Sequence, residues 1–165
     1  MIEPTDTNTV PNIPSALLVA AGQDRFGEQR RLGINTIDYK VTSQESTGLL
    51  IIEVTSHAKG GPERHLHVGQ DEWFYVLEGQ FLIEVAAERF RLTSGDAVLA
   101  PRRVPHAWAN VGEGKGRLLA VLTPAGKIEA FFRELAKTAS MAPPDPALWR
   151  AYDLEWVGPP LPIEP

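Results

Sequence analysis

Three of the four histidines in this chain, together with one glutamate, have the residue types and the spacing of a metal site. His65 and His67 are two residues apart, so in a strand their side chains project from the same face. Glu72 opens the aromatic and β-branched run 73–77, which is typical of a strand. Two imidazoles and a carboxylate can then face one point, and His106 could supply another nitrogen from a distant strand. Mixed nitrogen and oxygen ligands suit borderline first-row transition metals.

The segments around these residues resemble the two sequence motifs of the cupin family. The first motif combines a glycine, His-x-His, a glutamate and a second glycine, and it is matched, with its first glycine displaced by one position, by Gly60, His65, His67, Glu72 and Gly79. The second motif is matched by Gly95, Pro101, His106 and Asn110. Arg103 stands where the second motif has an internal glycine. A positive φ at this position would cost an arginine roughly 1 kcal/mol.

This resemblance implies an all-β fold, the double-stranded β-helix or jelly-roll barrel of the cupins, with a C-terminal α-helix. It also implies one divalent transition metal (iron, manganese, nickel, cobalt, copper or zinc) bound by His65, His67, Glu72 and His106. Glu72 has two candidate roles, because a carboxylate beside a metal can be a ligand or can act as the catalytic base. The sequence leaves both roles open.

The pattern along the chain agrees with one barrel domain. We expect an N-terminal arm over residues 1–14, a cupin β-barrel over 15–124, and a C-terminal helix with an extended tail over 125–165. Short apolar or alternating segments between glycine-bearing turns are typical of a sandwich or barrel. The expected strands, besides the one that carries His65 and His67, cover residues 17–20, 36–41, 48–54, 73–77, 81–85, 89–92, 97–100, 106–111 and 118–122.

After Pro124 the apolar residues fall at helical spacing, from Ile128 to Leu135, which predicts an amphipathic helix that braces the barrel. A further helical turn is expected over residues 147–152. The apolar tail 156–161 would either lie on the barrel or reach a partner subunit. By the family resemblance we expect a homodimer.

Composition excludes several classes of function. The chain has 165 residues and a formal net charge of −5, which argues against nucleic-acid binding, since that needs a basic face. Cysteine is absent, so there is neither a disulfide framework nor a thiolate metal site. The start of the chain lacks a basic secretory signal, and its apolar stretch 16–21 is too short to span a bilayer. We therefore expect a cytoplasmic protein with no membrane or nucleic-acid partner.

Strand parity also proposes residues for a substrate pocket. Phe74 and Val76 share parity with Glu72, while Trp108 and Asn110 share parity with His106. Packing in the core is the alternative for Trp108, and bracing of the local strand or turn is the alternative for Asn110. The fourth histidine, His57, is expected in an exposed loop, or else at the mouth of the pocket.

Three arginines lie close to the motifs in sequence: Arg64, Arg102 and Arg103. Arg64 has the opposite parity to His65 and should point away from the metal. Surface ion pairs are the simpler explanation for all three. The alternative is that one of them binds an anionic substrate, because a guanidinium group suits a carboxylate or phosphate.

The stretches 71–79, 104–106 and 123–126, with the following 131–135, look similar to small bacterial cupins of the quercetin 2,3-dioxygenase type. That resemblance implies an enzyme that opens a ring bearing an enolic or phenolic hydroxyl on a small-molecule substrate. Two alternatives remain open. A metal-dependent isomerase of a small sugar or keto compound would need a basic pocket wall, for instance Arg102 or Arg103. A non-catalytic binding module would have its site plugged by side chains.

Overall fold

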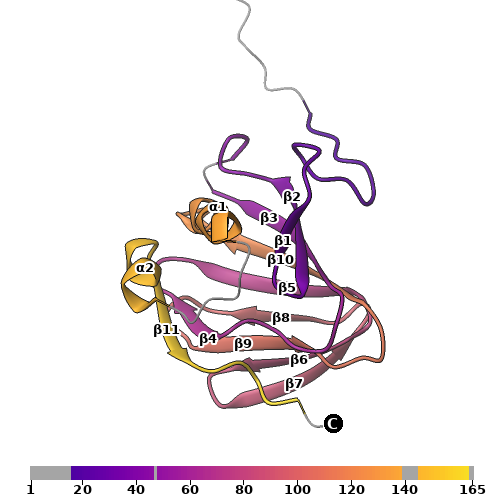
Figure 1. Ribbon diagram of the computed structural model, residues 1–165, viewed down its shortest axis with the longest axis vertical. Helices are drawn as coiled ribbons and strands as arrows, with labels where there is room; N and C mark the ends of the chain where they lie inside the picture. The colour runs from indigo at the N-terminus through magenta and orange to yellow at the C-terminus, as the bar shows by residue number, and fades with distance from the viewer. Residues whose placement is uncertain (1–15, 47, 139–144, 164–165) are drawn as a thin grey trace, which may run out of the picture.

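Two antiparallel sheets, packed face to face, make up most of the computed structural model, which describes residues 16–46, 48–138 and 145–163 (Figure 1). One sheet has the order β1-β2-β3-β10-β5-β8 and the other β11-β4-β9-β6-β7. The strands are β1 (Arg30–Leu32), β2 (Asn35–Val41), β3 (Leu50–Ser56), β4 (Arg64–His67), β5 (Asp71–Glu78), β6 (Gln80–Val85), β7 (Glu88–Thr93), β8 (Ala97–Ala100), β9 (His106–Asn110), β10 (Gly116–Thr123) and β11 (Leu154–Gly158). The helices are α1 (Ile128–Thr138) and α2 (Pro146–Ala151).

The core lies between the two sheets, because alternate residues of each central strand are apolar and face inward. In β10, Leu118, Ala120 and Leu122 are buried. This strand pairs with β3 on one side and β5 on the other, and Ala120 lies opposite Ile52 and Phe74. The prediction of an all-β fold followed by a C-terminal helix is confirmed.

The two helices lie at one end of the sandwich, on the left in Figure 1. In α1 the apolar face packs inward through Ile128 and Phe131, as the helical spacing predicts. The start of α2 is stabilised by Asp145, whose carboxylate accepts a hydrogen bond from the Ala147 amide at 2.9 Å. The helices meet through the rings of Phe131 and Trp149, whose centroids are 5.3 Å apart.

Two expectations for the ends of the chain need correction or completion. The strand expected at residues 17–20 is absent, and this segment is largely exposed, with Leu18 at 89%. Among the described residues it takes part in neither sheet. The tail lies on its own barrel, because β11 pairs with β4 and Leu161 packs against Ala107 and Ala109. The expected arm 1–14 falls outside the described residues.

In the part of the chain that the structure describes, no helix is both long enough and apolar enough to cross a membrane.

Candidate metal centre

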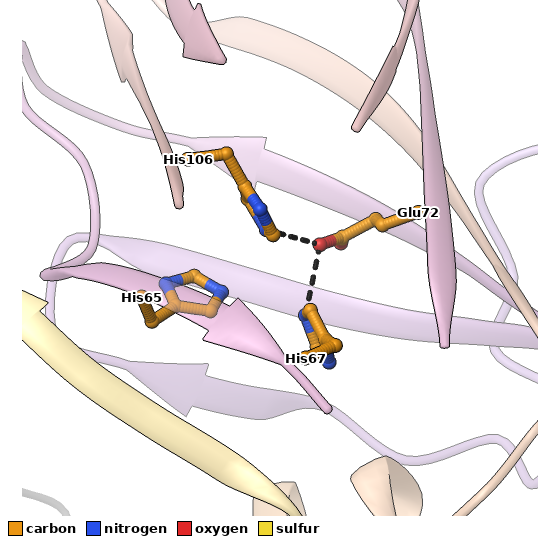
Figure 2. Close-up of side chains that lie close together, drawn as sticks. All are labelled: His65, His67, Glu72 and His106. Carbon is orange, nitrogen blue, oxygen red and sulfur yellow. Dashed lines mark hydrogen bonds and ion pairs between the residues drawn. The ribbon is translucent and has the colours of Figure 1, made fainter. Parts of the chain in front are cut away.

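The four residues that the sequence singles out come together between the two sheets (Figure 2). His65 and His67 project from β4 and His106 from β9, and these two strands pair with His65 opposite His106. Glu72 comes from β5 in the other sheet. Their ligand atoms all lie within 4.8 Å of one another. His65 and His67 therefore face the same point, as strand parity predicts. The pairing of β4 with β9 adds His106, and the packing of the two sheets adds Glu72.

Glu72 is at the centre of the group. Its Oε2 atom lies 3.0 Å from Nε2 of His67 and 3.0 Å from Nε2 of His106. Burial opposes ionisation of this carboxyl, but the hydrogen bonds with His106 and His67 outweigh it and hold the pKa of Glu72 well below its usual range. Burial would also lower the pKa of His106, and here the hydrogen bond with Glu72 prevails and raises it. Glu72 is thus an anion at neutral pH.

The outer nitrogen of each imidazole is held by an oxygen acceptor. Nδ1 of His65 donates to the Glu63 carbonyl at 2.7 Å, and Nδ1 of His106 donates to the Val104 carbonyl at 3.0 Å. Nδ1 of His67 lies 3.3 Å from Oε1 of Gln70. Since these oxygens can only accept, each ring carries a proton on Nδ1, and Nε2 is the ring atom turned toward the centre.

This donor set fits a divalent transition metal. Nε2 of three imidazoles and one carboxylate converge on the same small volume, and once the Nε2 atoms release their protons this set of acceptors is stabilised by a cation. Hydrogen bonds from the outer nitrogens of metal-binding histidines are the usual way in which a protein fixes ring orientation.

Gln70 is a functional candidate that sequence reasoning missed, because it belongs neither to the two motifs nor to the strand parity of the metal ligands. Its Nε2 donates to the carbonyls of Pro124, at 3.0 Å, and Ala125, at 2.6 Å. These two bonds leave Oε1 facing His67. Gly126 makes room for the amide, since a Cβ at that position would lie 2.6 Å from Gln70 Nε2. No sequence motif connects residues this far apart in the chain.

His65 differs from the other two histidines because it is more accessible from the adjoining cavity. Burial, and then the neighbouring His106 and His67, lower the pKa of His65 to about 3. The ring is therefore neutral at physiological pH, which is the form that binds a metal.

A cavity of about 410 Å³ adjoins the metal centre, and His65, His67 and Glu72 form part of its wall. The rest of the wall is mainly apolar and comes from β2, β3, β9, β10, both helices and the segments next to them. The apolar lining residues are Leu32, Ile37, Ile52, Val54, Pro62, Trp108, Ala120, Ile128, Phe131, Phe132, Leu135, Leu148, Trp149 and Leu154. No lysine or arginine is among the lining residues that the structure describes.

Of the four residues that strand parity proposes for the pocket, the structure places some in the cavity wall and others elsewhere. Trp108 lines the cavity. Phe74 and Val76 do not, and both are fully buried in the core. Asn110 is also absent from the wall, and its amide donates to the carbonyls of Ala58, at 3.3 Å, and Gly114, at 2.9 Å. Parity identifies inward-facing side chains, but packing decides which of them border empty space.

The remaining candidates lie outside the cavity wall. His57 is exposed, and its Nε2 lies 2.8 Å from the Thr36 hydroxyl. Arg64 turns away from the centre, as predicted, and pairs with Glu84 at 2.7 Å. Arg102 forms a two-point contact with Asp71. Arg103 adopts φ 65°, the left-handed conformation for which the motif has glycine.

Comparisons with known proteins agree with this architecture. Residues 52–122 match the family model of the cupin domain. An uncharacterized protein of Methanocaldococcus jannaschii is 32% identical over 60 residues, a match that covers 36% of this chain and only 48% of that protein.

Two solved structures are similar in fold. An RmlC-like cupin from Shewanella frigidimarina has a TM-score of 0.55 and 23% identity, over 67% of this chain and 93% of that chain. KdgF from Halomonas sp. has a TM-score of 0.54 and 21% identity, over 59% of this chain and 86% of that chain. At such identities the likeness concerns the fold alone. Fold and family model agree, and residues 52–122, which contain all four residues of the centre, are similar to a cupin domain.

Proposed function

We propose that this protein is a metal-dependent enzyme of the dioxygenase type, similar to quercetin 2,3-dioxygenases, and that it acts on an uncharged small molecule with an enolic or phenolic hydroxyl. One observation supports this most strongly. His65, His67 and Glu72 belong to the candidate metal centre and also line an apolar cavity large enough for a two- or three-ring compound. A ligand in the cavity can therefore reach the centre directly.

The proposed cofactor is one divalent transition metal, bound through Nε2 of the three histidines and the Glu72 carboxylate. When bound, such an ion makes a substrate hydroxyl more acidic, and a redox-active ion also supports reaction with dioxygen, which zinc does not.

The chain's own groups provide the rest of the proposed chemistry. The Glu72 carboxylate is ionised and borders the cavity, so it can accept the proton of a substrate hydroxyl. Trp108, Phe131 and Trp149 surround the cavity with aromatic surface, which excludes water and holds a flat apolar ligand.

The two alternatives have less support. An isomerase acting on an anionic sugar needs a basic wall, but neither Arg102 nor Arg103 lines the cavity, and Arg102 is paired with Asp71. A binding module with a plugged site does not agree with a cavity of about 410 Å³ beside the centre.

The test is oxygen uptake by protein stripped of metal and reloaded separately with iron, manganese, nickel, cobalt, copper or zinc. Flavonols and simpler enols serve as substrates, and each reaction is repeated without oxygen. We expect uptake with at least one redox-active metal and none with zinc. The absence of uptake in every combination would contradict the proposal.

The variant Glu72→Gln separates the two roles of this residue. It keeps the size of the side chain and removes its charge. If Glu72 is mainly a base, the variant retains stoichiometric metal by elemental analysis and loses turnover. If it is mainly a ligand, metal content and turnover fall together. Glu84→Gln, which removes a buried carboxylate outside the centre that is paired with Arg64 and Arg89, is the matched control.

A further inference from the structure

The cavity wall contains one amide whose position suggests a second point of contact for a ligand. Asn35 begins β2 and, like Ile37 two residues later, faces inward and lines the cavity. It is only 8% exposed. Its strand neighbour across the sheet is Ser56, and the Ser56 hydroxyl donates to Asn35 Oδ1 at 2.6 Å. This bond orients the amide and leaves Nδ2 on the other side.

Asn35 Nδ2 has no hydrogen-bond partner among the residues that the structure describes. Within the same part of the chain, every side-chain nitrogen or oxygen that is fully enclosed does have a partner. Nδ2 is therefore not sealed in the core, and the accessible space beside Asn35 is the cavity. A donor in an apolar wall is stabilised when a ligand supplies an acceptor.

Asn35 is well separated from the metal centre. Its strand β2 is followed across the sheet by β3, β10 and β5, the strand that carries Glu72. With neighbouring strands about 4.8 Å apart, three intervals give roughly 14 Å across the sheet. The register adds roughly 20 Å along the strands, because Asn35 pairs with Ser56 of β3 whereas Glu72 lies level with Leu50 of the same strand. Between the two ends the wall is formed by Ile52, Val54 and Ala120, which are apolar. A ligand that reaches both ends is therefore longer than two aromatic rings.

The charges of the wall also restrict the ligand. Three acidic residues outside the metal centre belong to the cavity wall, Glu63, Glu134 and Asp145, and among the described lining residues there is no lysine or arginine to oppose them. The Glu63 carboxylate accepts from Trp156 Nε1 at 3.2 Å. Lys137 pairs with Glu134 at 2.6 Å but does not itself line the cavity. A carboxylate on the ligand would be desolvated next to negative charge with no cation in the wall.

We infer that Asn35 determines substrate specificity: its amide donates to an acceptor, such as a carbonyl, at the end of the substrate remote from the reacting hydroxyl. The substrate class is then an uncharged, elongated three-ring compound with a hydroxyl at one end, a neutral acceptor at the other, and no carboxylate. This inference rests on the proposed function, since it places the hydroxyl at the metal centre.

The test measures binding without turnover, by calorimetry on the full-length zinc-loaded protein. Three probes share one scaffold: 4-acetyl-4″-hydroxy-p-terphenyl, its 4-isopropyl analogue without an acceptor, and 4″-hydroxy-p-terphenyl-4-carboxylate. For the wild type we expect the acetyl probe to bind at least tenfold more tightly than the carboxylate. A carboxylate that binds as tightly as the acetyl probe, or failure of all three probes to bind, would overturn the inference.

The variants Asn35→Asp and Asn35→Leu identify the donor. The aspartate keeps the size of the side chain and the acceptor for Ser56 but has no amide hydrogen, so it remains informative if the leucine variant does not fold. We expect either variant to weaken the acetyl probe roughly three- to tenfold, the effect of one lost hydrogen bond, and to leave the isopropyl probe within twofold. Equal effects on both probes would overturn the role of Asn35. Oxygen uptake is a separate readout, so a failed dioxygenase assay with this binding pattern intact would reject the reaction alone.

Discussion

Neighbouring side chains set the protonation states of His65, Glu72 and His106 in the centre. Glu72 is buried yet ionised because it makes hydrogen bonds with two imidazoles, and His106 is more basic than usual because of the same contact. His65 has no such contact with the carboxylate and remains neutral. A metal and a proton compete for the same Nε2 atoms, so metal binding should weaken as the pH falls.

The lowered pKa of His65 predicts how the stability of the metal-free protein depends on pH. The folded chain keeps this ring neutral down to about pH 3, whereas in the unfolded chain it takes up a proton near its ordinary value of 6.5. The contribution of this group is therefore fully present above pH 6.5 and declines as the pH falls from 6.5 toward 3, by about 1.4 kcal/mol per pH unit.

Denaturant unfolding of EDTA-treated protein between pH 5 and 6.5 measures this slope. Glu72 contributes only at lower pH, because its pKa is lowered from 4.5, and the raised pKa of His106 affects stability only above 6.5. The variant His65→Leu should flatten the slope, while His57→Leu, at an exposed position, should leave it unchanged. An unaltered slope in His65→Leu would contradict the assignment.

Arg103 gives a second prediction at the scale of the residue. Its φ of 65° strains any side chain, so Arg103→Gly should increase the free energy of unfolding by roughly 1 kcal/mol. The exchange also removes the contact of Arg103 Nε with the Val68 carbonyl at 3.3 Å. Arg103→Ala removes the same contact and keeps the backbone strain. The difference in the free energy of unfolding between the two variants, measured by chemical denaturation, is therefore the cost of that strain. Equal stability of the two would show that the turn relaxes.

At the scale of elements, Gln70 connects the metal centre to the turn that leads into α1. The substitution Gly126→Ala should push Gln70 aside, because the new Cβ would lie 2.6 Å from its Nε2. His67 then loses the acceptor that orients it, and metal affinity should fall roughly 10- to 100-fold. Competition with a chromophoric chelator measures that affinity.

Gly27 provides the matched control for this substitution. Its φ is 69°, close to the 57° of Gly126, but a Cβ there would meet nothing within 4 Å. Gly27→Ala should therefore lower stability through backbone strain and leave metal affinity unchanged. If both variants bind metal like the wild type, Gln70 does not position His67.

At the scale of the whole molecule, the centre ties the two sheets together, with Glu72 on one and the histidines on the other. Metal that binds only the folded chain stabilises it by mass action, about 4 kcal/mol at a free concentration 1,000 times Kd. We expect chelation to lower the melting temperature by several degrees and re-addition to restore it, as followed by scanning calorimetry. His106→Ala should abolish the difference; its persistence would place the stabilising ion elsewhere.

The homodimer also stays a prediction. The tail does not need a partner subunit, since β11 pairs with β4 of the same chain. Two side chains of β11, Trp156 and Val157, are nevertheless each 40% exposed. Light scattering on the full-length chain gives the oligomeric state, and a monomer at all accessible concentrations would reject the prediction.

Much of the fold was predictable because local patterns determine it. The alternation in 36–41 predicts a strand, and the helical spacing from Ile128 to Leu135 predicts a helix. Each pattern lies within one segment, and each segment has the predicted structure. Residues 17–20 have strand composition and still form no strand, because a strand needs a neighbour to pair with, and composition does not show one.

The four residues of the centre were determined by sequence alone, since a short spacing and strand parity put His65 and His67 on one face, and two motifs add Glu72 and His106. Only the tertiary structure decided what surrounds them. Gln70 meets Pro124 and Ala125, Asn35 reaches a cavity shared with His65, and Phe74 and Val76 are sealed in the core although their parity is right. These outcomes depend on how two sheets and two helices fill a volume, and packing between distant segments leaves no local pattern in the chain.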